Sequence, residues 1–220
     1  MPEQNQLENL EDEAIVPIQR IYKTIKFRST LETRWAIFFD MLGWEWEYEP
    51  FGVKNTEAVW FPDFLIKGYG NKRILVEVKP FTTFQEFKEL YETKYDRSLI
   101  NTEYQFDEVL LLGSDIYKKC DIHQGPRLGW LVERSRWLDR FEIFSQVEEA
   151  VFWYKDDKYG FASDTSCWHC RITNNYEGGS GIKFPPYNKM LSLWIEAWEI
   201  AKTQEIYRGD ITWSENITSV

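Results

Sequence analysis

The sequence predicts an α+β (α/β) fold, in which helices flank a mixed sheet and a β-rich C-terminal extension with a terminal helix follows. Three observations predict it. A capped amphipathic segment begins at Ser29, and two apolar runs that carry a few charges follow between residues 60 and 79. A wholly apolar run lies at 109–112, and beyond it aromatic residues alternate with polar ones before a last amphipathic segment.

The first element is a helix. Ser29 and Glu32 have the spacing of a capping box, in which each residue satisfies a backbone N–H of the other. Apolar residues then recur with the helical period at Leu31, Trp35, Phe38 and Leu42. Gly43 is the residue type that commonly follows a helix at the C′ position. The pattern therefore predicts a helix that ends at Gly43.

Three strands are expected next. Residues 44–48 alternate between apolar and acidic side chains and stop before Pro50. Residues 60–66 form the second candidate strand. A turn at 68–71, which reads GYGN, leads into the third candidate strand at 73–79.

The remaining elements complete an α-β-β-β-α-β order and extend it. Residues 84–98 carry an apolar helical stripe, and 108–113 reads as a fully buried strand. Residues 127–162 suggest short antiparallel strands, and 187–204 forms an amphipathic helix.

Composition divides the chain into three parts. Residues 1–16 are acidic and lack periodicity, so a flexible tail is expected there. A core is expected over 17–115, and an aromatic-rich extension over 116–220. A membrane span needs about 18 consecutive apolar residues, and the chain has no such run. It also lacks the pattern of a signal peptide, so a cytoplasmic location is expected.

Charged residues lie inside two of the apolar runs. Residues 74–79 read ILVEVK, and the alternation of a strand places Glu77 and Lys79 on one face. Burying such groups is costly unless they are paired or bind a metal. If Asp63 begins the neighbouring strand, two carboxylates and an amine converge, and this combination suits a divalent cation and a phosphodiester.

The spacing of these residues resembles that of the PD-(D/E)XK nuclease superfamily. Pro62-Asp63 is followed, after a gap of 13 residues, by Glu77-Val78-Lys79. Residues 27–40 are similar to the first helix of small phage and mobile-element members. Further similarity to that subgroup lies in 47–50, which reads EYEP, and 76–80, which reads VEVKP. The match covers about residues 22–90.

The resemblance implies a restriction-endonuclease-like core and assigns roles to its residues. Asp63, Glu77 and the Val78 carbonyl would bind Mg²⁺ (or Mn²⁺), which takes oxygen ligands and needs few from the protein. Lys79 would orient the attacking water or neutralise the phosphate. The alternative is an ordinary surface strand with a Glu/Lys pair, which contributes little to stability.

Three residues of the first helix region have two interpretations each. Glu32 either accepts the Ser29 backbone N–H as a capping residue or, as the resemblance implies, assists at the metal. Arg28 and Arg34 either bind phosphate or lie solvated on the helix surface.

The function that the resemblance implies is a metal-dependent endonuclease that hydrolyses DNA and leaves 5′-phosphate and 3′-hydroxyl ends, as that superfamily does. One alternative is the endonuclease subunit of a heteromeric transposase. Another is a non-catalytic module that binds nucleic acid or protein.

Charge bears on the partners of such an enzyme. The net charge of −10 disfavours unaided binding of long DNA, since DNA-binding surfaces are usually basic. Basic residues do follow the acidic tail and the motif, at Lys23, Lys26, Arg28, Lys88, Lys94 and Arg97. A partner protein is therefore expected alongside DNA. The resemblance also implies a homodimer or a larger assembly, since such enzymes often cut both strands in that way.

A second candidate site combines two short pairs of metal-ligating residues. Cys120 and His123 form one pair, and Cys167 and Cys170 form the other. Thiolates and imidazole at such spacings close the tetrahedron of a structural Zn²⁺ site, with His169 as an alternative ligand. Against zinc, buried single cysteines are common in proteins.

Overall fold

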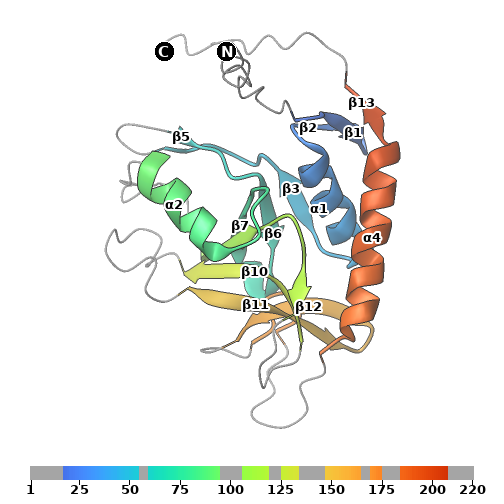
Figure 1. Cartoon of the computed structure of the whole chain (residues 1–220). Helices are drawn as coiled ribbons and strands as arrows, with labels where there is room; N and C mark the ends of the chain where they lie inside the picture. The colour runs from blue at the N-terminus through green and yellow to red at the C-terminus, as the bar shows by residue number, and fades with distance from the viewer. Residues whose placement is uncertain are drawn as a thin grey trace, which may run out of the picture.

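The computed structural model of the chain describes residues 17–54, 59–94, 106–118, 125–133, 147–164, 169–174 and 184–207. Its elements form three layers, with an eight-stranded sheet between helix α2 on one face and helices α1 and α4 on the other (Figure 1). The mixed α+β class predicted from the sequence is confirmed.

Helix α1 (Thr30–Met41) begins as predicted. Its N-cap is Ser29, whose Oγ accepts a hydrogen bond from the Glu32 backbone N–H at 3.1 Å. Gly43 follows the helix with φ of +72°, a left-handed conformation that glycine adopts without the clash of a Cβ. Buried aromatic side chains of α1 contact the sheet and α4, namely Trp35, Phe38 and Phe39.

The first half of the sheet has the expected order of elements. Strands β3 (Trp46–Tyr48), β6 (Phe64–Lys67) and β7 (Arg73–Val78) pair as an antiparallel meander. Helix α2 (Phe84–Lys94) then crosses over, and β8 (Glu108–Leu112) pairs in parallel with β7. The crossover is what a parallel pair requires, because a tight turn cannot join parallel strands.

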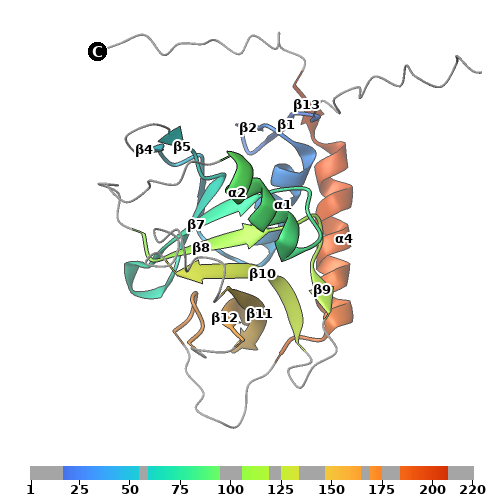
Figure 2. The same ribbon diagram turned by 60° about the vertical axis from the view of Figure 1, so that its left-hand side comes forward.

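The second half of the chain continues the same sheet. Strands β10 (Pro126–Glu133), β11 (Glu148–Lys155) and β12 (Lys158–Ser163) are antiparallel, and β9 (Tyr117–Lys118) pairs with β10. The order across the sheet is β12-β11-β10-β8-β7-β6-β3, so the predicted extension joins the core edge to edge through β8 and β10 (Figure 2). Helix α4 (Tyr187–Thr203) packs along α1.

Two smaller sheets complete the described structure. Strands β1 (Arg20–Tyr22), β2 (Ile25–Phe27) and β13 (Glu205–Ile206) form one of them, beside the first turn of α1. Strands β4 (Val53–Lys54) and β5 (Val59–Trp60) form the other.

Some expected boundaries differ from those of the structure. The strand expected at 60–66 is split, since β5 ends at Trp60 and β6 begins at Phe64. Pro62 lies in the gap, where the absence of an N–H prevents ladder pairing. The turn between β6 and β7 contains a short 3₁₀ helix (Tyr69–Asn71). Residues 95–98 of the expected second helix and the tail 1–16 lie outside the described residues.

Arg34 is buried, so it does not lie solvated on the helix surface. Its side chain is 9% exposed, and its Nε and Nη2 donate to the Trp194 carbonyl at 3.2 and 3.1 Å. The guanidinium also stacks over the Trp194 ring, 3.5 Å from its centroid. Arg34 therefore links α1 to α4.

In the described part of the chain, no helix has the length and apolarity needed to cross a membrane.

Candidate active site

Asp63 occupies the position directly before β6, and its carboxylate is fixed from two directions. Oδ2 accepts the Val78 backbone N–H at 2.7 Å, and Oδ1 accepts Arg28 Nη2 at 2.6 Å. The paired registers of β6 and β7 end at Phe64 and Val76. The carboxylate therefore replaces a ladder partner for Val78, and the side chain is only 3% exposed.

Glu77 in β7 and Lys79 directly after it project on the face that carries Leu75, as strand alternation predicts. Glu77 is 2% exposed, and its Oε2 accepts the indole N–H of Trp60 at 2.9 Å. Its Oε1 lies 2.5 Å from the Lys79 ammonium. Each oxygen of the buried Glu77 carboxylate therefore has a donor.

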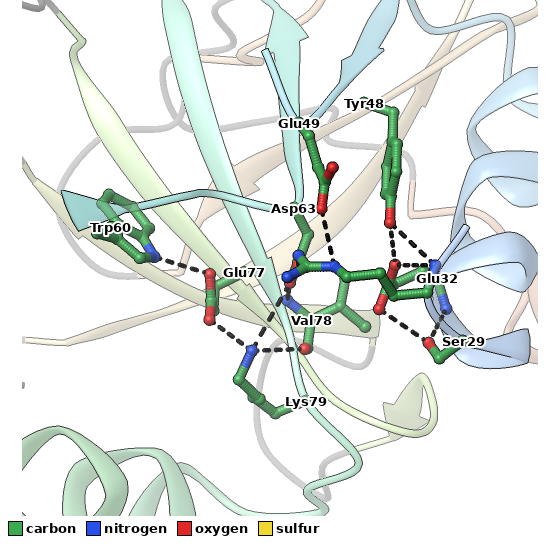
Figure 3. Close-up of polar contacts among 10 residues, drawn as sticks. Ser29, Glu32, Tyr48, Glu49, Trp60, Asp63, Glu77, Val78 and Lys79 are labelled. Atoms are coloured by element: carbon green, nitrogen blue, oxygen red, sulfur yellow. Dashed lines mark hydrogen bonds and ion pairs between the residues drawn. The ribbon is translucent and has the colours of Figure 1, made fainter. Parts of the chain in front are cut away.

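Three oxygens from two adjacent segments surround the Lys79 ammonium (Figure 3). Besides Glu77 Oε1, the Nζ atom lies 3.2 Å from the Val78 carbonyl oxygen and 3.8 Å from Asp63 Oδ2. The Lys79 side chain is 25% exposed, so this cluster reaches solvent. The structure thus brings together all four residues that the sequence assigned to metal binding and to the attacking water.

Burial dominates the electrostatics of Glu77. It raises the pKa of Glu77 to about 7, and the negative charge of Asp63 acts in the same direction. The charge and hydrogen bond of Lys79 and the indole N–H of Trp60 lower the pKa but do not cancel this effect. A second cation beside Asp63 and Glu77 would stabilise the ionised pair.

Glu32 joins the site from α1 without touching Lys79 in the contacts described. Its Oε1 accepts the Ser29 hydroxyl at 3.0 Å, and Oε2 accepts the Tyr48 hydroxyl at 2.5 Å and the Arg28 backbone N–H at 3.1 Å. The expected capping contact to the Ser29 backbone N–H is therefore replaced by one to the preceding residue. Burial and the charge of Asp63 raise the pKa of Glu32.

Four residues of the site had no assigned role at these carboxylates from the sequence. Arg28 bridges Asp63 and Glu49, the latter at 2.8 Å from its Nε. Trp60 lies two positions before the PDF motif and donates its indole N–H to Glu77. Tyr48 anchors Glu32, and burial followed by the charge of Glu32 raises the pKa of that hydroxyl. The EYEP segment carries Tyr48 and Glu49, and it was the signal in the sequence for both.

The donor set suits a hard divalent cation with few protein ligands. Two carboxylates and one carbonyl lie around a common point, and such a set is sufficient for Mg²⁺ when waters and phosphate complete the octahedron. Among the described residues, no group of three His, Cys, Asp or Glu side chains gathers to hold a metal ion. The protein ligands of a metal here would therefore be the two carboxylates and the backbone carbonyl, with water or phosphate oxygens as the others.

Most of the proposed zinc ligands lie outside the described residues, namely Cys120, His123 and Cys167. Cys170 is described and is 2% exposed. Its sulfur accepts the Thr173 backbone N–H at 3.4 Å and packs against Gly160, where a Cβ would lie 2.2 Å from it. The zinc site stays a prediction.

No family model matches the chain, and no curated protein is significantly similar to it. The resemblance to PD-(D/E)XK nucleases therefore stays a prediction from the motif. The structure adds that Asp63, Glu77 and Lys79 lie together.

Proposed function

We propose that the protein is a metal-dependent endonuclease that hydrolyses phosphodiester bonds in DNA. The observation that carries the proposal is the convergence of Asp63, Glu77 and the Val78 carbonyl on one cationic group, the Lys79 ammonium, at 3.8, 2.5 and 3.2 Å. The oxygens that surround the Lys79 ammonium are also of the type that binds a divalent metal ion.

Asp63, Glu77 and the Val78 carbonyl would hold Mg²⁺ or Mn²⁺. Such an ion supplies positive charge at the phosphate and lowers the pKa of a water molecule that it binds. The chain fixes the ligands in advance, since the Val78 N–H holds Asp63 and the Trp60 indole holds Glu77. Fixed ligands need no reorganisation when charge develops in the transition state.

Lys79 is the group that acts on the reacting atoms. Its ammonium is partly exposed beside both carboxylates, so it can donate to the attacking water or to a phosphate oxygen. In the reaction, the water oxygen bonds to phosphorus and the P–O3′ bond breaks. The water gives up a proton and O3′ gains one, which leaves 5′-phosphate and 3′-hydroxyl ends. Glu32 would assist indirectly in this scheme. It accepts the backbone N–H of Arg28, and the guanidinium of Arg28 contacts Asp63.

The proposal includes DNA as the partner, a homodimer or larger assembly to cut both strands, and a cytoplasmic location. The net charge of −10 supports an assembly, because an acidic protein binds a long polyanion weakly by itself.

A non-catalytic binding module is the second candidate. It is favoured by the fact that Arg28, Lys79, Trp60 and the Val78 N–H already occupy the oxygens of Asp63 and Glu77. In that case the cluster would serve only to stabilise the fold.

A plasmid-nicking assay with Mg²⁺ or Mn²⁺ separates the two functions. Metal-dependent nicking by the wild type, abolished in both Asp63→Asn and Lys79→Ala, is the expected result. Lys67→Gln is the matched control, since Lys67 is an exposed, ion-paired lysine at the other end of β6. Equal nicking by all four proteins would indicate a contaminating nuclease, and binding without nicking would support the module.

A further inference from the structure

Arg28 lies between β2 and the N-cap of α1, and two carboxylates hold its guanidinium. Nη2 donates to Asp63 Oδ1 at 2.6 Å. Nε lies 2.8 Å from Glu49 Oε1 but has no hydrogen-bond partner, so this second contact is an ion pair alone. The contact with Asp63 is both a hydrogen bond and an ion pair, and the contact with Glu49 is an ion pair only.

Most donors of this guanidinium are unused. An arginine presents five N–H donors in a planar fork, and the single hydrogen bond made by the Arg28 side chain uses one of them. Within the described part of the chain, nothing accepts a hydrogen bond from Nη1. The side chain is 40% exposed, so a ligand can reach it from solvent. A planar fork with free donors is the group that binds phosphate in a bidentate manner.

Glu49 is held in a strained conformation where it meets Arg28. Its φ is +43°, in the left-handed region that residues other than glycine rarely adopt. Its backbone N–H donates to the Asp63 carbonyl at 2.9 Å, which ties the strained residue to the site. Strained backbone conformations of this kind often occur at ligand-binding positions.

We propose that Arg28 binds a phosphate group of the nucleic-acid substrate through its free donors, while Asp63 and Glu49 hold the guanidinium in position. The proposal rests on the proposed function for the identity of the ligand. It makes Arg28 a substrate-binding residue beside the metal ligand Asp63, and it adds a positive contact to a protein whose net charge is −10.

The test is DNA affinity measured by fluorescence anisotropy on a labelled duplex oligonucleotide, with Ca²⁺ in place of Mg²⁺ so that binding is read apart from cleavage. Arg28→Gln should weaken binding about tenfold. The slope of log affinity against log salt should fall by about 1, as expected for one lost phosphate contact. Arg28→Lys keeps the charge that Asp63 and Glu49 need and should give an intermediate affinity, which guards against a variant that fails to fold.

Two further readouts complete the test. Mn²⁺ affinity by calorimetry should not fall in Arg28→Lys, because the arginine competes with the cation for Asp63. Lys67→Gln should leave DNA affinity and the salt slope unchanged. Wild-type affinity and slope in both Arg28 variants would overturn the proposal, as would a wild type that does not bind the duplex. Failure of the nuclease function would look different, with Arg28-dependent binding but no cleavage in Mg²⁺.

Discussion

Glu77 shows how one residue can make stability depend on pH. Its folded-state pKa of about 7 lies above the usual value of 4.5. A raised pKa means that the folded protein binds the proton more tightly than the unfolded chain does. The contribution of protonated Glu77 to the free energy of unfolding is therefore fully present below pH 4.5 and is lost as the pH rises through 7.

Glu77→Gln should remove this dependence in the metal-free protein. The amide keeps the shape of the side chain and cannot ionise, so the variant should be the more stable protein at pH 8, by up to about 3 kcal/mol. The difference should shrink towards pH 5. Thermal unfolding at several pH values with a chelator present measures it. A constant offset between variant and wild type at all pH values would show that Glu77 does not titrate in this range.

The sequence predicted which charged residues lie together better than it predicted their individual contacts. Strand alternation placed Glu77 and Lys79 on one face, and a motif placed Asp63 beside them. The contact of Arg28 with Asp63 joins positions 35 residues apart. No local pattern encodes such a pairing, because it depends on how β2, α1 and β6 are arranged in space.

Local patterns were sufficient for several elements. The helix at α1 and the hairpin of β6 and β7 follow from capping, periodicity and turn residues within a few positions of each other. The split of the expected strand at 60–66 follows from Pro62, which interrupts pairing because it lacks an N–H. The irregularity of β10 was not predicted, since a bulge is defined by the partner strand.

Gly129 in β10 provides a test at this scale. The register with β11 shifts between Arg127 and Gly129, and a Cβ at Gly129 would lie 2.2 Å from the Leu111 carbonyl oxygen. Because a backbone atom cannot move aside alone, Gly129→Ala should separate β8 from β10 and destabilise the protein by about 3 kcal/mol or more.

Gly70→Ala is the matched control for that variant. Gly70 has φ of +67° but open space around its missing Cβ, so only the strain of the left-handed conformation applies. The expected loss is about 1 kcal/mol. Chemical denaturation of the two variants measures the difference. Equal losses of stability in the two variants would mean that the close approach of β8 to β10 does not exclude a side chain at position 129.

The whole molecule is built around contacts between the two halves of the chain. Strand β8 of the first half pairs with β10 of the second, and the rings of Trp35 and Trp194 lie 4.2 Å apart between α1 and α4. Sheet order is a non-local property, so the alternating pattern after residue 113 predicted strands without predicting which strand they would join.

Such contacts should make unfolding cooperative over the whole chain. Tryptophan fluorescence and far-ultraviolet circular dichroism should report one transition with the same denaturant midpoint, as a two-state domain does. Two separated transitions would mean that residues 17–115 and 116–220 are stable independently of each other.

The central claim is that Asp63 and Glu77 hold one divalent cation. Calorimetric titration of Mn²⁺ into the metal-free protein at pH 8 tests it most directly. We expect one ion per chain in the wild type and in Lys67→Gln, and no saturable binding in Asp63→Asn or Glu77→Gln. Equal Mn²⁺ binding by all four proteins, or no binding by the wild type, would contradict the claim.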